Sequence, residues 1–183
     1  MPTVISHSLV AVVFGKIFSK STGVKFWVLS IISAILPDID VIMVSFGIPY
    51  QHILGHRGVS HSVLFASVIA LLIVIAGFRE IKHFSKLWWS FVAYFFCIGL
   101  SHGVLDAMTS GGLGVGFFMP FDLTRYFFPV RPIRATPFSI IRFFGTEGQR
   151  ILVSELFWIW IPAIILLCLI QFIKAKRHSH VTK

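Results

Sequence analysis

The sequence predicts an all-α membrane protein with about five transmembrane helices. Of its 183 residues, 56% are hydrophobic and only 13% are charged, and the mean hydropathy of +0.88 is too high for a soluble domain of this length. Three long runs carry almost no charge: Ser62–Phe78, Leu87–Leu105 and Ile151–Ile173. Because each run is long enough, or nearly so, to cross a bilayer, we expect residues 1–183 to form a single integral membrane domain.

Two shorter apolar runs, at about Val4–Phe18 and Val24–Leu36, precede these segments. Short helices can still cross a membrane where their polar ends line a cavity inside the protein, so we expect both to span. Pro37 follows the second run. Since proline disfavours helix in the residue before it and lacks an N–H donor, the helix is predicted to end or kink there.

The basic residues predict the orientation. The net charge is +9, and all eight lysines fall in the loop after the first helix, the loop before the fourth helix and the tail (Lys16, Lys20, Lys25, Lys82, Lys86, Lys174, Lys176 and Lys183). Five spans put these three regions on one side, which the positive-inside rule makes cytoplasmic. We therefore expect a multi-pass protein of a bacterial or archaeal plasma membrane, with residues 174–183 as a basic cytoplasmic tail.

A polar cluster ends the fourth apolar run and carries the strongest functional signal. His102 and Asp106 are four residues apart, which is about 400° of helical rotation, so their side chains share one face and can hold one metal ion. Ionisable residues in a membrane helix are costly and are by default functional. The alternative is a polar pair that only packs one helix against another.

Five further candidate ligands lie where other predicted helices meet the same outer face. They are His7 at the start of the first helix, Asp38 and Asp40 after the second, and His56 and His61 before the third. His56 and His61 are about 140° apart on a helix, so a turn at Gly58 is needed to bring them together, with Ser60 as N-cap and His61 in the first helical turn. The alternatives are loop carboxylates in contact with water and a polar histidine at a helix interface.

Histidine and carboxylate ligands without thiolate favour a divalent metal, zinc first and manganese as an alternative. A mononuclear catalytic site needs only three protein ligands. Seven candidates, three of them carboxylates, favour two ions over one, as in hydrolytic sites with paired metals.

The segment 107–150 is predicted to be an outer loop lying at the membrane surface. Its aromatic residues alternate with arginines (Phe117, Phe118, Phe121, Tyr126, Phe127 and Phe128 with Arg125, Arg131, Arg134 and Arg142). This composition suits rings in the acyl boundary and guanidinium groups on lipid phosphates. A loop that binds nucleic acid has a similar composition, but the hydrophobic content favours lipid, and no nucleic-acid partner is expected.

Three ordered motifs resemble those of the YdjM-like membrane-bound metal-dependent hydrolases. They are Leu36-Pro37-Asp38-Ile39-Asp40, His56-Arg57-Gly58-Val59-Ser60-His61-Ser62, and His102-xxx-Asp106-xx-Thr109-xx-Gly112; an early histidine such as His7 is also typical of that family. The resemblance covers roughly residues 1–140 and implies a metal-dependent hydrolase without naming a substrate. More remotely, the order of ligands is similar to that of the zinc-dependent phospholipase C and single-strand nuclease group, whose N-terminal tryptophan ligand and second His-xxx-Glu/Asp pair this chain lacks.

We therefore expect a hydrolase that cleaves a phosphoester or phosphodiester bond, most simply in a membrane lipid or lipid-linked substrate, at a metal site facing the outside. The metal would activate a water molecule, and a second ion together with Arg57 or a loop arginine would neutralise the phosphate oxygens. Arg57 could instead pair with Asp38 or Asp40, and Asp40 and Thr109 are candidates for orienting a ligand or a bound water.

Two other classes remain as alternatives. A non-enzymatic metal-binding or metal-transport protein would use the same ligands, although transport requires polar residues through the bilayer centre. A metalloprotease is disfavoured because the sequence contains no H-E-x-x-H. The sequence does not predict the oligomeric state.

Overall fold

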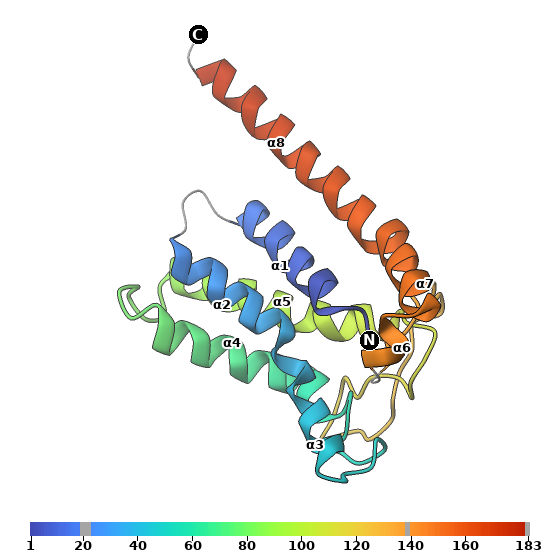
Figure 1. Ribbon diagram of the computed structural model, residues 1–183. Helices are drawn as coiled ribbons and strands as arrows, with labels where there is room; N and C mark the ends of the chain where they lie inside the picture. Colours follow the sequence, from blue (N-terminus) through green and yellow to red (C-terminus); the bar gives the residue numbers. More distant parts are fainter. Residues whose placement is uncertain (19–22, 138–139, 182–183) are drawn as a thin grey trace.

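The helices of the first half of the chain form a bundle. The computed structural model describes residues 1–18, 23–137 and 140–181. Helix α1 (Val4–Phe18) packs against α2 (Val24–Ile35), α2 packs against α5 (Lys86–Ala107), and α4 (Val63–Gly77) packs along α5. Figure 1 shows α1, α2, α4 and α5 lying side by side. No strand is present in the described residues, which confirms the all-α class.

The second predicted span is longer than its apolar run. The α-helix ends at Ile35, as expected before Pro37, but the chain continues as a 3₁₀-helix, η1 (Leu36–Asp40), and as α3 (Val41–Ser45). Pro37 occupies one of the first two positions of η1, where a missing N–H donor is tolerated. The helical path therefore runs over Val24–Ser45, 22 residues, and the two aspartates lie within it.

The third predicted span begins later than expected. Helix α4 starts at Val63, and its N-cap is Ser62, whose hydroxyl accepts a hydrogen bond from the Phe65 N–H at 3.0 Å. The prediction of Ser60 as N-cap was wrong, because the preceding residues Val59–His61 form a separate 3₁₀ turn, η2. At 15 residues, α4 is about 22 Å long, shorter than a hydrocarbon core of about 30 Å.

The C-terminal helix is nearly continuous. Helix α7 (Thr146–Glu155) passes through a π-helical turn, η3 (Leu156–Trp160), into α8 (Ile161–Val181). A short helix, α6 (Ile140–Phe143), precedes it. The predicted outer loop 107–150 therefore ends in helices, and its remainder is irregular apart from isolated backbone bridges such as Thr109 with Ile133.

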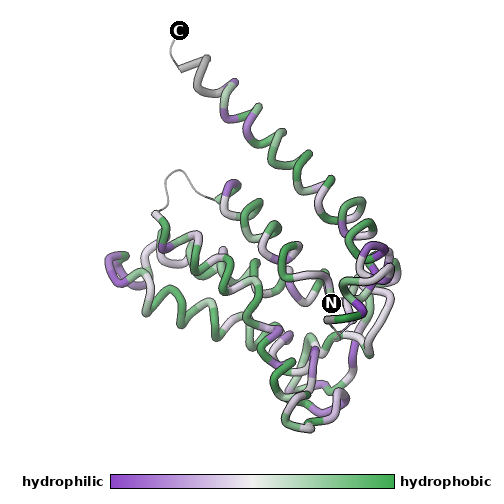
Figure 2. The backbone as a smooth tube through the Cα atoms, in the orientation of Figure 1, coloured by the Kyte–Doolittle hydropathy of each residue, from purple (hydrophilic) through white to green (hydrophobic). Residues whose placement is uncertain are grey.

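Within the described residues, three helices are long and apolar enough to cross a membrane: Val24–Ser45, Lys86–Ala107 and Thr146–Lys176. The shorter apolar helices α1 and α4 accompany them. Large apolar side chains are exposed along α8, and Figure 2 shows hydrophobic colouring along the helices with hydrophilic residues gathered near their ends. Exposed apolar surface of this extent marks a protein that faces lipid.

The end of the bundle that carries the lysines has an aromatic core. Phe26, Phe95, Trp88 and Tyr94 are buried there with neighbouring aliphatic residues. At this end, Lys25 of α2 forms an ion pair of 2.8 Å with Glu80, which follows α4, and Lys174 Nζ of α8 donates to the Lys16 carbonyl of α1 at 2.6 Å. The candidate ligands lie at the opposite end of the same helices.

Candidate metal centre

Two residues of α5 and one from each of two neighbouring segments bring four ligand atoms together. His102 and Asp106 share one face of α5, Asp38 comes from η1 and His61 from η2. His61 Nε2 lies 3.1 Å from His102 Nε2, 3.4 Å from Asp106 Oδ2 and 3.7 Å from Asp38 Oδ1, and His102 Nε2 lies 3.3 Å from Asp38 Oδ1. We call these four residues the inner cluster.

The spacing of the inner cluster fits one divalent ion. A tetrahedral zinc with ligands about 2.0–2.1 Å away holds its ligand atoms about 3.3–3.4 Å from one another. The side chains of His61 and Asp106 are fully buried, and that of Asp38 is 10% exposed. Among the described residues, no carboxylate oxygen of Asp38 or Asp106 accepts a hydrogen bond, although Asp106 Oδ2 forms an ion pair with Arg57 Nε at 2.9 Å. Buried carboxylates without donors are costly, and a cation at this point would neutralise them.

Each histidine of the inner cluster has its second ring nitrogen occupied. His102 Nδ1 lies 2.7 Å from the Ala34 carbonyl, to which only a protonated nitrogen can donate. His61 Nδ1 lies 3.1 Å from Asp40 Oδ2. A donor role for Nδ1 leaves the lone pair on Nε2, so both rings present a ligand atom to the same point.

Asp40 organises a second layer behind His61. Its oxygens accept from His56 Nδ1 at 2.7 Å, from the Ser60 hydroxyl at 2.5 Å and from the Arg57 backbone N–H at 3.0 Å, in addition to His61. Asp40, His56 and His61 have the composition of a second metal-binding group. Because these ligand atoms already bind one another, the geometry favours an orienting role for Asp40 and His56.

The carboxylates of the two layers raise the pKa of His61, which lies between them. Burial by itself lowers the pKa of His61, but its contacts with Asp106, Asp38 and Asp40 raise it well above the usual value. Burial also lowers the pKa of His56, against the opposing effect of the hydrogen bond that its Nδ1 donates to Asp40. Negative charge therefore dominates around His61, which is the environment a cation requires.

His7 is the last of the seven predicted ligands and lies on α1. Its ring stacks on that of His102 with centroids 3.8 Å apart, its Nε2 lies 3.7 Å from Asp106 Oδ1, and neither ring nitrogen has a hydrogen-bond partner among the described residues. His7 and the second oxygen of Asp106 are thus two ligands available for a further ion. All seven predicted ligands meet at one end of the bundle, in two layers.

Arg57 is buried beside the inner cluster and contacts a carboxylate that was not expected. Its Nε lies 2.9 Å from Asp106 Oδ2, and its two terminal nitrogens donate to Thr109 Oγ1 and to the Gly111 carbonyl, each at 3.0 Å. The side chain therefore pairs with Asp106 rather than with Asp38 or Asp40. Thr109 in turn donates to the Asp106 carbonyl at 2.8 Å, so both residues brace the end of α5.

The turn that joins His56 to His61 differs from the predicted one. The left-handed residue is Arg57, with φ of 63°, whereas φ at Gly58 is negative. Gly58 is required because a Cβ there would lie 2.1 Å from the Ile53 carbonyl oxygen. Gly112, with φ of +84°, permits a close approach to the Arg57 guanidinium. The glycines of this region therefore serve packing around Arg57.

Comparison with known proteins identifies the family. Residues 1–178 match the profile described as YdjM inner membrane protein. The chain belongs to the YdjM inner membrane protein family. Inner membrane protein YbcI of Escherichia coli (strain K12) is 38% identical over 168 residues, which cover 91% of this chain and 95% of that protein. No solved structure gives a significant match.

Membership of the YdjM family confirms the resemblance drawn from the three motifs and extends it through the last helix. It also agrees with the three helices able to cross a membrane. The catalytic roles predicted for Asp40, Arg57 and Thr109, the number and identity of the ions and the orientation of the site stay predictions.

One polar residue of this YdjM family member was not expected near the site. Glu155 is fully buried at the start of the π-helical turn, where it accepts from the Thr3 N–H at 2.5 Å and from the hydroxyls of Thr3 and Ser6 at 2.6 Å. Trp160 Nε1 donates to Ser6 Oγ at 2.7 Å. These bonds fix the last helix to the turn of α1 that carries His7. A lone carboxylate inside an apolar run was the available sequence signal.

Proposed function

We propose that this protein is a membrane-embedded, metal-dependent hydrolase that cleaves a phosphoester or phosphodiester bond of a lipid or lipid-linked substrate. The observation that carries the proposal is the inner cluster. His61 Nε2 lies 3.1–3.7 Å from a ligand atom of each of the other three residues, all four ligand atoms lie within 4.8 Å of one another, and Nδ1 of each histidine already has an acceptor. Preorganised ligands of this kind are typical of sites that hold a divalent ion for hydrolysis.

The residues of the chain have distinct tasks in this proposal. A bound divalent ion would supply a water molecule of lowered pKa and positive charge next to a phosphate group. Asp40 holds the ring of His61, the Ala34 carbonyl holds that of His102, and Arg57 holds the carboxylate of Asp106. Zinc fits the nitrogen and oxygen ligands, with manganese as an alternative, and His7 supports a second ion.

The surroundings favour a substrate that reaches the site from the membrane. Asp38 is the most exposed member of the inner cluster, so substrate is expected to approach on its side. Exposed aromatic residues such as Phe118 and Phe121 lie on the loop that follows α5. Side chains of this kind enter the acyl boundary, which would hold the site close to lipid phosphates.

A non-enzymatic metal-binding role is the second candidate. Four protein ligands fill a tetrahedral shell, which is the arrangement of structural zinc, whereas catalytic zinc keeps an open position. Ion transport has less support, because the aromatic core around Phe26 and Phe95 occupies the other end of the bundle and an ion path needs polar groups through the bilayer.

The test combines metal analysis with a substrate screen. Protein purified in uncharged detergent is analysed for bound metals and then incubated with phosphatidic acid, phospholipids and polyprenyl phosphates, with release of phosphate or phosphorylated headgroup as the readout. We expect metal-dependent release that a chelator stops and that His102→Ala abolishes, while His52→Ala, an exposed histidine, retains it. Bound metal without release from any of these lipids would favour the non-enzymatic candidate.

A further inference from the structure

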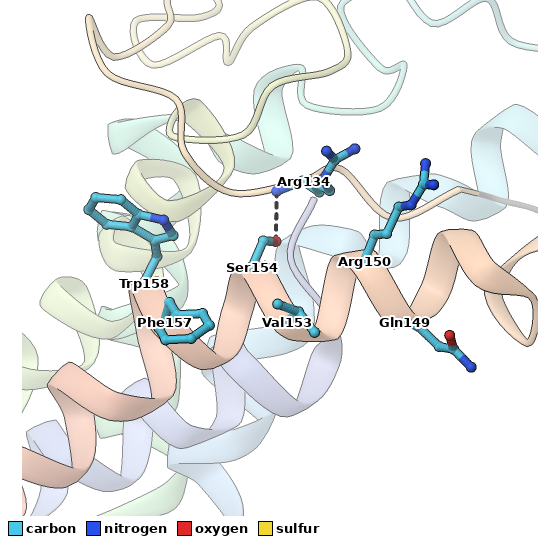
Figure 3. A pocket seen from close by; sticks show the side chains of 7 residues that line it. All are labelled: Arg134, Gln149, Arg150, Val153, Ser154, Phe157 and Trp158. Atoms are coloured by element: carbon cyan, nitrogen blue, oxygen red, sulfur yellow. Dashed lines mark hydrogen bonds between the residues drawn. The ribbon is translucent and has the colours of Figure 1, made fainter.

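A second feature of the same end of the molecule is an open groove on the outer side of the last helix. Its volume is about 870 Å³, and its lining includes Arg134, Arg150, Val153, Ser154, Phe157 and Trp158. Figure 3 shows the guanidinium groups of Arg134 and Arg150 on the same side of α7 and the rings of Phe157 and Trp158 further along the helix. The groove is therefore basic at one end and aromatic at the other.

The length of the helix places this groove at the depth of lipid headgroups. Lys174 marks the basic end of α8, where its Nζ donates to the Lys16 carbonyl. About 20 residues are needed to cross the hydrocarbon core, and counting back that number from Lys174 reaches Ser154. Arg150 then lies one turn outside the core. Arg134 lies at the same depth as Ser154, because its backbone N–H donates to Ser154 Oγ at 3.0 Å.

The two arginines of the groove differ from the other arginines at this end. Arg57 pairs with Asp106, Arg125 donates to the His56 and Tyr50 carbonyls, Arg131 stacks over Phe127, and Arg142 pairs with Glu147. Within the described part of the chain, the guanidinium groups of Arg134 and Arg150 form no hydrogen bond or ion pair with protein. No acidic residue lines the groove, so its fixed charges can be balanced only by a ligand or by solvent.

The aromatic end of the groove continues into the membrane-facing surface. Val153, Phe157 and Trp158 are each more than half exposed. Val153 and Phe157 follow Arg150 at spacings of three and four residues, and Trp158 follows the groove residue Ser154 by four. The rings thus lie about two turns below Arg150. Aromatic residues close to basic residues are typical of a membrane interface, where rings meet the first part of the acyl chains. A ligand that fits both ends carries an anionic group and an apolar chain.

We propose that this groove binds an anionic phospholipid, with the headgroup phosphate between Arg134 and Arg150 and an acyl chain along Phe157 and Trp158. The site is separate from the metal centre and requires no hydrolysis. The groove nevertheless lies close to the metal-ligand cluster. Ile133, which precedes Arg134, accepts from the Ser110 N–H at 2.8 Å and donates to the Met108 carbonyl at 3.3 Å, and both residues belong to the segment that follows Asp106. A lipid in the groove would steady this segment.

Native mass spectrometry of the detergent-purified full chain tests the proposal. In the presence of a chelator, the wild-type protein is titrated with phosphatidylglycerol and, separately, with phosphatidylcholine that carries the same acyl chains. The same titrations are made with the double variant Arg134→Gln/Arg150→Gln and with Arg131→Gln as a matched control. Each basic residue near a lipid surface contributes on the order of a five-fold factor in affinity, so the double variant should bind phosphatidylglycerol about 10- to 30-fold more weakly. The control and phosphatidylcholine binding should be unchanged.

Three results would overturn the proposal: equal phosphatidylglycerol binding by the double variant, an equal loss in the control, or displacement of the lipid by inorganic phosphate, which would indicate a site for a soluble anion.

A second measurement uses wild type alone and is independent of how the variants fold. Phosphatidylglycerol with a photoreactive acyl chain should label the peptide containing Phe157 and Trp158, and labelling confined to other peptides would contradict the assignment. Because metal is removed in the titration, neither result depends on the proposed hydrolase.

Discussion

The two ends of α5 are equally buried but are built in different ways. Toward the lysine end, Trp88 and Phe95 are buried in the aromatic core. Near the other end, His102 and Asp106 are just as buried, but each side chain contacts a specific polar group. Apolar packing tolerates many side chains of similar volume, whereas a buried carboxylate is stable only with a matched partner. The lysine end is therefore held by apolar packing, and the ligand end by specific polar contacts.

The largest effect is expected for labelling of the two ends in intact cells. In a background with Cys97→Ala and Cys168→Ala, a cysteine at Phe118 should react with a membrane-impermeant thiol reagent, and one at His83 should not, because the lysines are expected on the cytoplasmic side. The two sites are both exposed and lie at opposite ends of the bundle. The reverse pattern would invert the orientation and put the metal centre in the cytoplasm.

The second-largest effect is expected on metal affinity when two nitrogen ligands are removed. His61→Ala/His102→Ala should lower metal affinity by more than about 100-fold, because two of the four atoms of the inner cluster disappear while Asp106 keeps its partner Arg57. Elemental analysis after dialysis measures the effect, with His52→Ala as control. Full metal occupancy in the double variant would refute the assignment of the inner cluster.

Replacement of Arg57 separates its two possible roles. Arg57→Met leaves Asp106 buried without a counter-charge, so the free energy of unfolding of the metal-free protein should fall by about 3–5 kcal/mol. Denaturant titration in detergent measures this quantity. If stability instead stays the same and only turnover falls, then Arg57 acts on substrate phosphate, as the sequence alone allowed.

Removal of the charge on Glu155 should have a smaller effect. Glu155→Gln weakens bonds from Thr3 and Ser6 to a charged acceptor, each of which contributes about 1.5–3 kcal/mol, so thermal stability should fall while the lysine end keeps its packing. Glu147→Gln is the matched control, since that carboxylate pairs with Arg142 at the surface. Equal stability of the two variants would show that Glu155 does not fix the last helix to α1.

The smallest effect is expected in the aromatic core. Phe95→Leu keeps the site apolar and of similar volume, so the free energy of unfolding should fall by less than about 1.5 kcal/mol. Metal content per folded chain should equal that of wild type, because Phe95 lies in the aromatic core rather than in the ligand cluster. Metal loss in this variant would mean that the two ends of α5 are coupled.

Several features followed from the sequence alone. Apolar runs identified the membrane class, and the four-residue spacing of His102 and Asp106 placed both on one face of α5, because helical geometry fixes neighbours within one turn. The predicted order of the spans placed His7, Asp38, Asp40, His56 and His61 at the same end of the bundle, because each lies where a predicted helix meets the outer face. The motifs pointed to the YdjM family, which the comparison over residues 1–178 confirmed.

Only the tertiary structure decided how these residues divide their tasks. Asp40 lies behind His61 because loop residues 56–61 fold around it, Arg57 pairs with Asp106 across 49 positions of sequence, and Glu155 reaches Thr3 across 152. No helical period relates such residues, since their distances depend on how loops cross and helices pack. The sequence therefore determined which side chains gather at one end of the bundle, and the packing of distant segments determined which of them form the inner cluster and which hold its members in place.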